Sequence, residues 1–431
     1  MSVKSKPYLW CFLIALLMRL LMIFLSHSKD HEIDLAIYRD AGQLVVNGIN
    51  PYDFNDNKEL RQKLRTDKDN FNEYVSSDQD RWDYYANSNL PLATLFFGCI
   101  EFCFASPRAF RYVFAFFDSI LAAMILAFVV NKWKYHLPDN KFVRSLPAKF
   151  RTDLPLYIGF SLGAISPVLL VWGTFIPEPK GIGLLLILSS IYFSDSSNRK
   201  LSMLLSPVLL GFSVAFIGLG IFITPLCLYN IYKNNKNGFR NITVYCLISF
   251  ISCAICLVPF MPELGIMMFN RINGAVNAEP YHGSMWTELF KLLPKGWLLF
   301  REALIIFFVI INIIGFLRKR LSVSILSANL LYLFTCIYLL DGSLDRMNIS
   351  IVTLILLVGF SGDFYITNIL WLFYFIYGVF SFFYSYFFGI KQDVDGLFVF
   401  LFTILYIALL LVQTFTKKAA GYEAINSNTG I

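Results

Sequence analysis

Charged residues are scarce in this chain. Of its 431 residues only 15% are Asp, Glu, Lys or Arg, whereas 57% are hydrophobic and 17% are aromatic. A soluble domain carries roughly 25% charged residues, so the composition excludes a soluble enzyme. Only a bilayer accommodates so many apolar side chains without aggregation. The sequence therefore predicts an all-α polytopic membrane protein.

The residues that build disulfide frameworks and metal sites are also few or dispersed. The chain has four His and eight Cys, and most of the Cys fall inside apolar stretches. They show neither a disulfide pattern nor a metal-ligand spacing, so we expect no metal site and no cofactor. No basic run alternates with exposed aromatic residues either. The net charge of +7 therefore does not indicate a nucleic-acid partner.

Apolar runs predict about twelve membrane crossings within a single membrane-embedded domain, 1–431. The runs lie near 8–26, 108–131, 154–172, 181–194, 203–232, 240–259, 298–317, 321–340, 347–360, 363–388 and 397–416. One of them, 203–232, is too long for one crossing and holds Gly218 and Gly220 at its middle. We expect two short crossings there, with a broken turn between them.

Charge distribution orients these crossings. With the N-terminus inside and with 91–105 as a juxtamembrane helix, the cytoplasmic segments carry eighteen Lys/Arg against five Asp/Glu, as the positive-inside rule requires. The two large extracytoplasmic loops are then 27–107 and 260–297. Between Lys29 and Asp83 the first loop holds thirteen acidic and eight basic residues. Membrane lipids are the expected surroundings, and function is expected on the extracytoplasmic side.

The first loop opens with a motif that we expect on a short helix ending at Gly48. The motif reads Asp34-x-x-x-Tyr38-Arg39-x-Ala41-Gly42, then Gly48-x-Asn50-Pro51-Tyr52, and later Asn89-Leu90-Pro91-Leu92-Ala93. From these residues alone, an acidic, solvated start of the loop is the favoured interpretation. The pattern resembles the N-terminal signature of GT-C membrane glycosyltransferases that use polyprenyl-phosphate sugars, and the helix and loop layout is similar over most of the chain.

The resemblance implies a GT-C-like fold with a catalytic Asp just after the first helix, and the matching residue is Asp34. A single carboxylate suffices to deprotonate an acceptor hydroxyl when the leaving group is already a phosphate. The family often places polar active-site residues in the short outer turn 173–180, so Glu178 is a possible second acid. Two prolines also bracket Glu178, and a rigid turn explains them equally well.

Cations are expected to hold the donor phosphate, and a mixture of polar and aromatic side chains to hold sugars. The phosphate candidates are Arg108, Arg111, Lys180 and Arg346, and the sugar or acceptor candidates are Tyr38, Arg39, Asn50, Tyr52, Arg271, His282 and Trp286. Arg108 and Arg111 lie one turn apart, which suits a bidentate clamp. Interfacial snorkelling accounts for them as well.

Two features stand apart from the family pattern. Many relatives carry a Lys shortly before a Pro in the broken central helices, whereas this chain reads Gly218-Leu-Gly-Ile-Phe-Ile-Thr-Pro225, and its Asn89-Leu90-Pro91 replaces Tyr-Pro-Pro. The phosphate contact is therefore expected elsewhere. Arg19 and Asp118 fall inside apolar helices, and we expect them to neutralise each other because an unpaired charge at that depth is costly.

The expected function is inverting transfer of one hexose or pentose from a polyprenyl-phosphate carrier to a hydroxyl of a glycan or glycolipid acceptor. The alternatives are a lipid-linked oligosaccharide flippase, which would show internal repeats, and a glycan polymerase or ligase, which would have a dominant loop in its second half. We find neither feature. A bacterial inner membrane with the site facing the periplasm is expected, with the endoplasmic reticulum and a lumenal site as the alternative.

Overall fold

The computed structural model describes most of the chain and contains helices, turns and short connections. The described residues are 6–25, 32–52, 89–133, 147–175, 177–234, 238–269, 284–292, 296–339, 344–388 and 392–416. Within these ranges there is no β-strand. The all-α prediction is therefore confirmed for the part of the chain that is described.

Seven helices are long and apolar enough to cross a membrane. They are Lys6–Leu25, Arg108–Trp133, Thr152–Leu170, Gly238–Phe260, Trp297–Leu317, Phe364–Tyr384 and Asp395–Phe415. Shorter apolar helices of 10–17 residues lie at Pro91–Phe104, Lys180–Ser194, Leu201–Ile217, Val323–Tyr338 and Met347–Phe360. The long helices indicate an integral, polytopic membrane protein.

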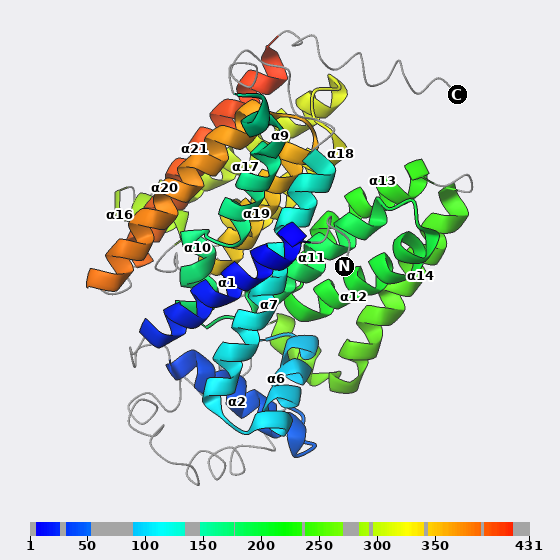
Figure 1. Cartoon of the computed structure of the whole chain (residues 1–431). Helices are drawn as coiled ribbons and strands as arrows, with labels where there is room; N and C mark the ends of the chain where they lie inside the picture. Colours follow the sequence, from blue (N-terminus) through cyan, green and yellow to red (C-terminus); the bar gives the residue numbers. More distant parts are fainter. Residues whose placement is uncertain are drawn as a thin grey trace.

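Figure 1 shows the helices in their order along the chain. The first half contains α1 (Lys6–Leu25), α2 (Glu32–Val46), α6 (Pro91–Phe104), α7 (Pro107–Phe128), η3 (Val129–Trp133), α9 (Ala148–Gly163), α10 (Pro167–Leu170), η5 (Val171–Phe175), α11 (Lys180–Ser194), η6 (Leu201–Leu205) and α12 (Ser206–Ile217). The second half contains η7 (Leu219–Ile223), α13 (Thr224–Asn234), α14 (Gly238–Leu257), η8 (Val258–Phe260), α16 (Met285–Leu292), α17 (Trp297–Leu317), α18 (Val323–Tyr332), η9 (Leu333–Tyr338), α19 (Leu344–Phe360), α20 (Phe364–Phe388) and α21 (Gln392–Phe415).

Helix breaks occur where the sequence predicts them. Gly218 ends α12 with a left-handed backbone, at a φ of 76°, and the chain continues through a 3-10 segment into α13. Gly48, at a φ of 72°, follows α2 in the same way. Glycine adopts this backbone conformation without the steric cost that a Cβ atom imposes. Both glycines therefore end their helices at defined positions.

The helix α7 and its continuation η3 define two ends of the molecule. Together they contain 27 residues, 22 in α7 and 5 in η3, which corresponds to about 40 Å. At the first end, α7 begins beside α2 and α6, which lie together below the other helices in Figure 1. We call this the α2–α6 end. The opposite end, where η3 finishes, is the Asp195 end.

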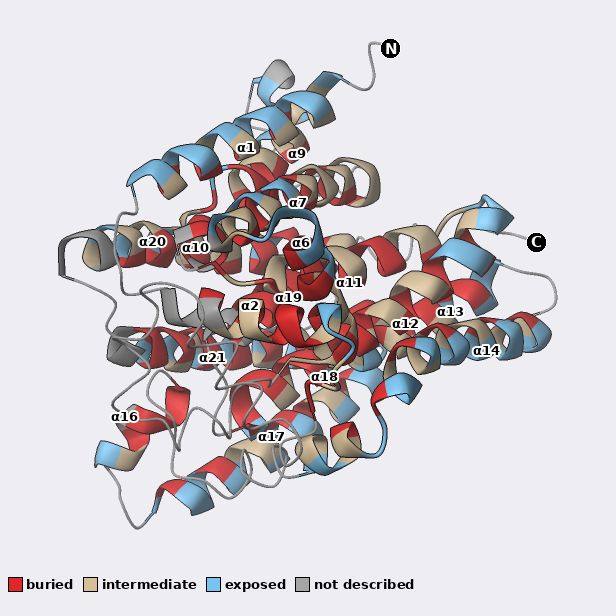
Figure 2. Ribbon diagram, turned by 90° about the horizontal axis from the view of Figure 1, so that it is seen from below, coloured by how far each residue is buried: buried red, intermediate tan, exposed pale blue. Residues whose placement is uncertain are grey.

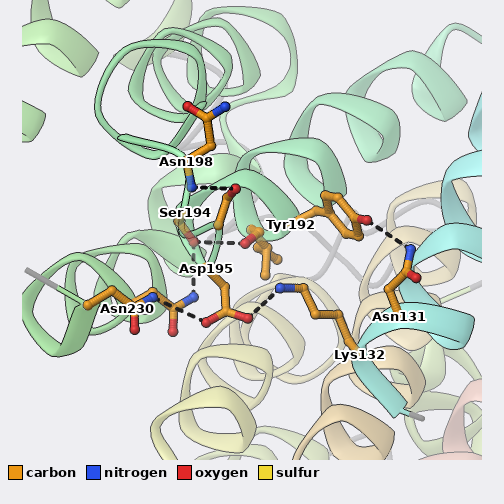
Figure 3. A network of polar contacts seen from close by, with 10 residues as sticks. Asn131, Lys132, Tyr192, Ser194, Asp195, Asn198 and Asn230 are labelled. Atoms are coloured by element: carbon orange, nitrogen blue, oxygen red, sulfur yellow. Dashed lines mark hydrogen bonds and ion pairs between the residues drawn. The ribbon is translucent and has the colours of Figure 1, made fainter. Parts of the chain in front are cut away.

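At the Asp195 end, polar side chains join three separate elements (Figure 3). Lys132 of η3 forms an ion pair with Asp195 at the end of α11, and Asn234 of α13 donates a hydrogen bond to the same carboxylate at 3.4 Å. Beside them, Asn131 donates to the Tyr192 hydroxyl at 2.9 Å. The segments that the charge pattern assigns to one side of the membrane, 132–153, 195–202 and 233–240, thus begin at a common end of the molecule.

Apolar side chains are exposed along the outward faces of peripheral helices. Figure 2 shows this for α1 and α14, where the exposed residues include Leu17, Phe24, Phe250 and Ile255. A continuous exposed apolar face of this kind is unfavourable in water and favourable in lipid. The main core lies inside the bundle and is formed by buried side chains from the later part of α7, from α21 and from helices that come between them in the sequence.

Trp133 joins the end of η3 to α19. Its indole N–H donates to the carbonyl oxygen of Leu356 at 2.9 Å, and a Cβ atom added at Gly359 would lie 2.2 Å from two atoms of the indole ring. The close approach of α19 to Trp133 therefore requires glycine at this position.

We expect Gly359→Ala to destabilise the protein by about 1–3 kcal/mol, because the new methyl group forces the buried indole or the helix to move. The midpoint of thermal unfolding of the purified protein in detergent measures this. Gly296→Ala is the control, since a Cβ atom there meets nothing within 4 Å. Equal melting midpoints for the two variants would contradict the packing argument.

Candidate active site

The site is built on the close packing of α2 against α6. A Cβ atom at Gly42 would lie 2.7 Å from the carbonyl oxygen of Phe97, and one at Gly98 would lie 2.7 Å from a methyl carbon of Val45. Small residues on both helices therefore permit this contact, as they do in helix pairs within membranes. The two helices form one unit at the α2–α6 end.

An aromatic cluster attaches this unit to the helix bundle. The ring of Tyr38 lies 4.7 Å from that of Phe97 and 5.8 Å from that of Phe114, measured between ring centroids. The same cluster includes Leu35 of α2 and Ile182 of α11. Each aromatic pair adds about 0.5–1.5 kcal/mol beyond the burial of its area. The cluster thus brings the first half of α2 to the beginning of α11.

Asp34 lies in α2, one residue before Leu35 and one helical turn before Tyr38. Its backbone is therefore on the side of α2 that contains the aromatic cluster. Its side chain is outside the described residues. The helix that the motif predicts is confirmed, because α2 runs from Glu32 to Val46 and Gly48 follows it.

The turn before α11 brings the predicted second acid and a predicted phosphate ligand together. Glu178 and Lys180 form an ion pair with 2.5 Å between the carboxylate oxygen and Nζ, and both side chains are largely covered. Lys180 is the first residue of α11, so Ile182 of the aromatic cluster follows two residues later. In this arrangement the two charges neutralise each other, and their separate functional roles stay predictions.

A buried carboxylate lies directly beside this turn. Cβ atoms added at Gly173 and Gly181 would lie 2.2 Å and 1.8 Å from the two carboxylate oxygens of Asp118, so both glycines provide space for that group. Arg19 and Asp118 are both buried, 0% and 3% exposed. Their atoms do not, however, meet in a hydrogen bond: Nε and Nη2 of Arg19 and both oxygens of Asp118 are buried without a hydrogen-bond partner in the described part of the chain.

Arg39 is held between α2 and α6. Its Nε donates to Oε1 of Glu101 at 3.4 Å, and the side-chain amide of Gln43 donates to the same oxygen at 3.0 Å. Arg39 and Gln43 are one turn apart on α2, so both reach one carboxylate on α6. Glu101 was not among the predicted site residues. The sequence feature that could have identified Glu101 is its position as the single acidic residue of the apolar run 91–105.

Asn50 and Tyr52 connect the end of the α2 segment to other elements. The Asn50 side chain donates to the Glu263 carboxylate at 3.2 Å. The Tyr52 hydroxyl donates to the Asn89 carbonyl at 2.7 Å and lies 2.9 Å from the Thr94 hydroxyl. Tyr52 is buried, and its ring packs on Phe260. These contacts join the two large loops predicted from the sequence, 27–107 and 260–297.

The other predicted site residues are dispersed or lie outside the described residues. Trp286 is fully buried and its indole N–H donates to the Ile337 carbonyl at 3.0 Å, while Tyr38 is buried in the aromatic cluster. Arg108 is exposed and Arg111 partly exposed on the first turns of α7. Arg346 is on α19, but its side chain is not described, and Arg271 and His282 fall outside the described ranges. Their ligand contacts stay predictions.

Sequence reasoning also missed Arg301, a buried cation near the start of α17. Its Nη2 donates to the Tyr338 carbonyl at 2.6 Å, and its guanidinium lies 5.4 Å from the centre of the Tyr338 ring. The signal was a lone Arg just inside the apolar run 298–317. Arg301 and Trp286 thus donate hydrogen bonds to two successive carbonyl groups at the end of η9.

Among the described residues, no group of three or more His, Cys, Asp and Glu side chains is placed to hold a metal ion. In comparisons with known proteins, the chain matches no protein-family model, no curated protein and no solved structure.

We expect Tyr52→Phe to lower stability by about 1–3 kcal/mol, because the Asn89 carbonyl and the buried Thr94 hydroxyl lose a partner. The thermal unfolding midpoint in detergent measures the effect. Tyr157→Phe on the exposed surface of α9 is the matched control. If both variants melted like the unmodified chain, the buried hydroxyl would have no structural role.

Proposed function

We propose that this chain is an inverting membrane glycosyltransferase of the GT-C type that takes a sugar from a polyprenyl-phosphate carrier. One observation carries the proposal most directly. The aromatic cluster of Tyr38, Phe97, Phe114 and Ile182 places the helix containing Asp34 beside the start of α11. Two regions that the sequence assigns to the site, the start of the first loop and the turn 173–180, thus meet through one buried cluster.

The proposed reaction needs few protein groups. The acceptor hydroxyl oxygen attacks the anomeric carbon, a new glycosidic bond forms, and the bond between the anomeric carbon and the phosphate oxygen breaks. The hydroxyl proton passes to the Asp34 carboxylate, and polyprenyl phosphate leaves with the bonding electron pair. A positioned carboxylate base of this kind contributes about 10²–10⁴-fold to the rate.

The proposal includes about twelve crossings, with the α2–α6 end outside the cell membrane or in the lumen. The basic residues of the Asp195 end support this orientation, since Lys132, Arg199, Lys200 and Lys233 all belong to segments that begin there. The helix α6 has 14 residues and measures about 21 Å, which is less than the about 30 Å of a hydrocarbon core. The charge pattern favours a juxtamembrane position for it, since a full crossing there would place the basic segments 132–153, 195–202 and 233–240 outside.

We expect Asp34→Asn to lower transfer at least about 100-fold while the protein folds normally, because the amide cannot accept the hydroxyl proton. The assay incubates purified protein with radiolabelled polyprenyl-phosphate hexoses and pentoses, without nucleotide sugars, and follows transfer to membrane glycolipids. Asp153→Asn on α9 is the matched control and should retain activity.

Two results would contradict this proposal. Normal transfer by Asp34→Asn would remove the proposed base. Absence of transfer from every donor by the unmodified chain would remove the proposed activity and favour a transporter of lipid-linked glycans.

We expect opposite labelling of two single cysteines placed in a cysteine-free background. A membrane-impermeant maleimide should label Ser77→Cys in intact cells, and it should label Arg199→Cys only after permeabilisation, because the two positions belong to opposite sides of the membrane. Labelling of both in intact cells, or of Arg199→Cys alone, would reverse the proposed orientation.

A further inference from the structure

The anchoring of Arg39 distinguishes it from the other cations of the site. Its carboxylate partner, Glu101, is only 6% exposed and is also bonded by the Gln43 amide at 3.0 Å. The contact to Arg39 is through Nε, on one edge of the guanidinium. Arginine has five N–H donors in a rigid fork, so an anchored Nε leaves the two terminal nitrogens for another acceptor.

The terminal nitrogens of Arg39 are available in the described part of the chain. No hydrogen bond from Nη1 or Nη2 to any described residue is formed, and 15% of the side chain is exposed. The two terminal N–H groups of a guanidinium are parallel, and their spacing matches two oxygens of a phosphate or carboxylate. The side chain is therefore restrained at one edge and open to an anion at the other.

The other cations differ from Arg39 in their partners or in their exposure. Lys180 forms its ion pair with Glu178. Arg301 donates to the Tyr338 carbonyl, and its guanidinium lies over the Tyr338 ring. Arg19 is fully buried beside Asp118. Arg108 is exposed on the first turn of α7 and is the main competitor for a phosphate.

The helix that holds Glu101 also carries exposed apolar side chains. Phe102 and Phe104 near the end of α6 are exposed. Phe104 follows Glu101 by three residues, which places it within about 60° of Glu101 around the helix. An anion bound at Arg39 would therefore lie next to a face suited to a hydrocarbon chain, and a lipid phosphate combines both properties.

We propose that Arg39 binds the phosphate of the lipid carrier, with Glu101 and Gln43 as positioning residues and the exposed face of α6 along the start of the isoprenoid tail. The inference rests on the proposed function and moves the phosphate site from Arg108, Arg111, Lys180 and Arg346 to α2. Arg39 follows Asp34 by five residues, about 7.5 Å along the helix axis and about 140° around it, so one helix would present the base and the phosphate ligand from two sides.

The test measures binding of farnesyl phosphate and of farnesol to the purified full-length chain in detergent by microscale thermophoresis. We expect Arg39→Gln to weaken farnesyl phosphate binding about tenfold or more and to leave farnesol binding unchanged, because only the phosphate uses the guanidinium. Arg39→Lys should give an intermediate value, since it retains the charge and loses the fork. Arg199→Gln at the Asp195 end is the matched control.

The role of Glu101 is tested by a double-mutant cycle. If Glu101 positions Arg39, the effect of Arg39→Gln on farnesyl phosphate binding should shrink to less than about threefold in a Glu101→Gln background. Independent effects that multiply would overturn the positioning role. Unchanged farnesol binding by each variant excludes a loss caused by misfolding.

The outcomes separate this inference from the proposed function. Normal farnesyl phosphate binding by Arg39→Gln, or a loss seen only with Arg108→Gln, would overturn the phosphate assignment and leave the Asp34 mechanism intact. If the unmodified chain bound farnesyl phosphate no better than farnesol, the inference would be overturned along with the lipid-phosphate donor. Asp34→Asn should bind farnesyl phosphate normally while losing transfer.

Discussion

The contact of Tyr38 with Phe97 and Phe114 is the interaction on which the candidate site depends. Helices exchange no backbone hydrogen bonds with one another, so side-chain contacts set the position of α2. Six residues, 26–31, separate α1 from α2, and this short connection limits where α2 begins without fixing its direction. The aromatic cluster supplies the direction, and Ile182 extends it to α11. Asp34 and the turn 173–180 therefore have a common support.

The charges near this cluster are organised by the cost of burying them. A carboxylate out of water needs hydrogen-bond donors or an opposite charge. Glu101 receives Arg39 and Gln43, and Glu178 receives Lys180, so each acid is neutralised within the protein. Asp118 is the exception, because its oxygens lie against two glycines without a hydrogen bond. The sequence predicts that Arg19 neutralises it, but no hydrogen bond joins the two side chains in the described part of the chain.

Local patterns predicted the helices better than the partners of their side chains. The end of α2 at Gly48, the short helix at 91–104 and the break at Gly218 follow from apolar periodicity and from glycine, which act over a few residues. The burial of Tyr52 and Trp286 depends on residues 37 and 51 positions away, Asn89 and Ile337. No spacing rule encodes such contacts, and the prediction that both residues bind sugars is made without them.

The motif of the first loop can now be divided by physical role. Tyr38 and Ala41 are buried against neighbouring helices, and Gly42 has no room for a Cβ atom beside the Phe97 carbonyl. Arg39, on another side of the helix, reaches Glu101. Four of the five motif residues between 34 and 42 thus serve the docking of α2, and only Asp34 has no packing role assigned to it. Most of the motif is therefore explained by how this helix packs, whereas the proposed chemistry needs Asp34 as the base and Arg39 as a residue that both packs and binds phosphate.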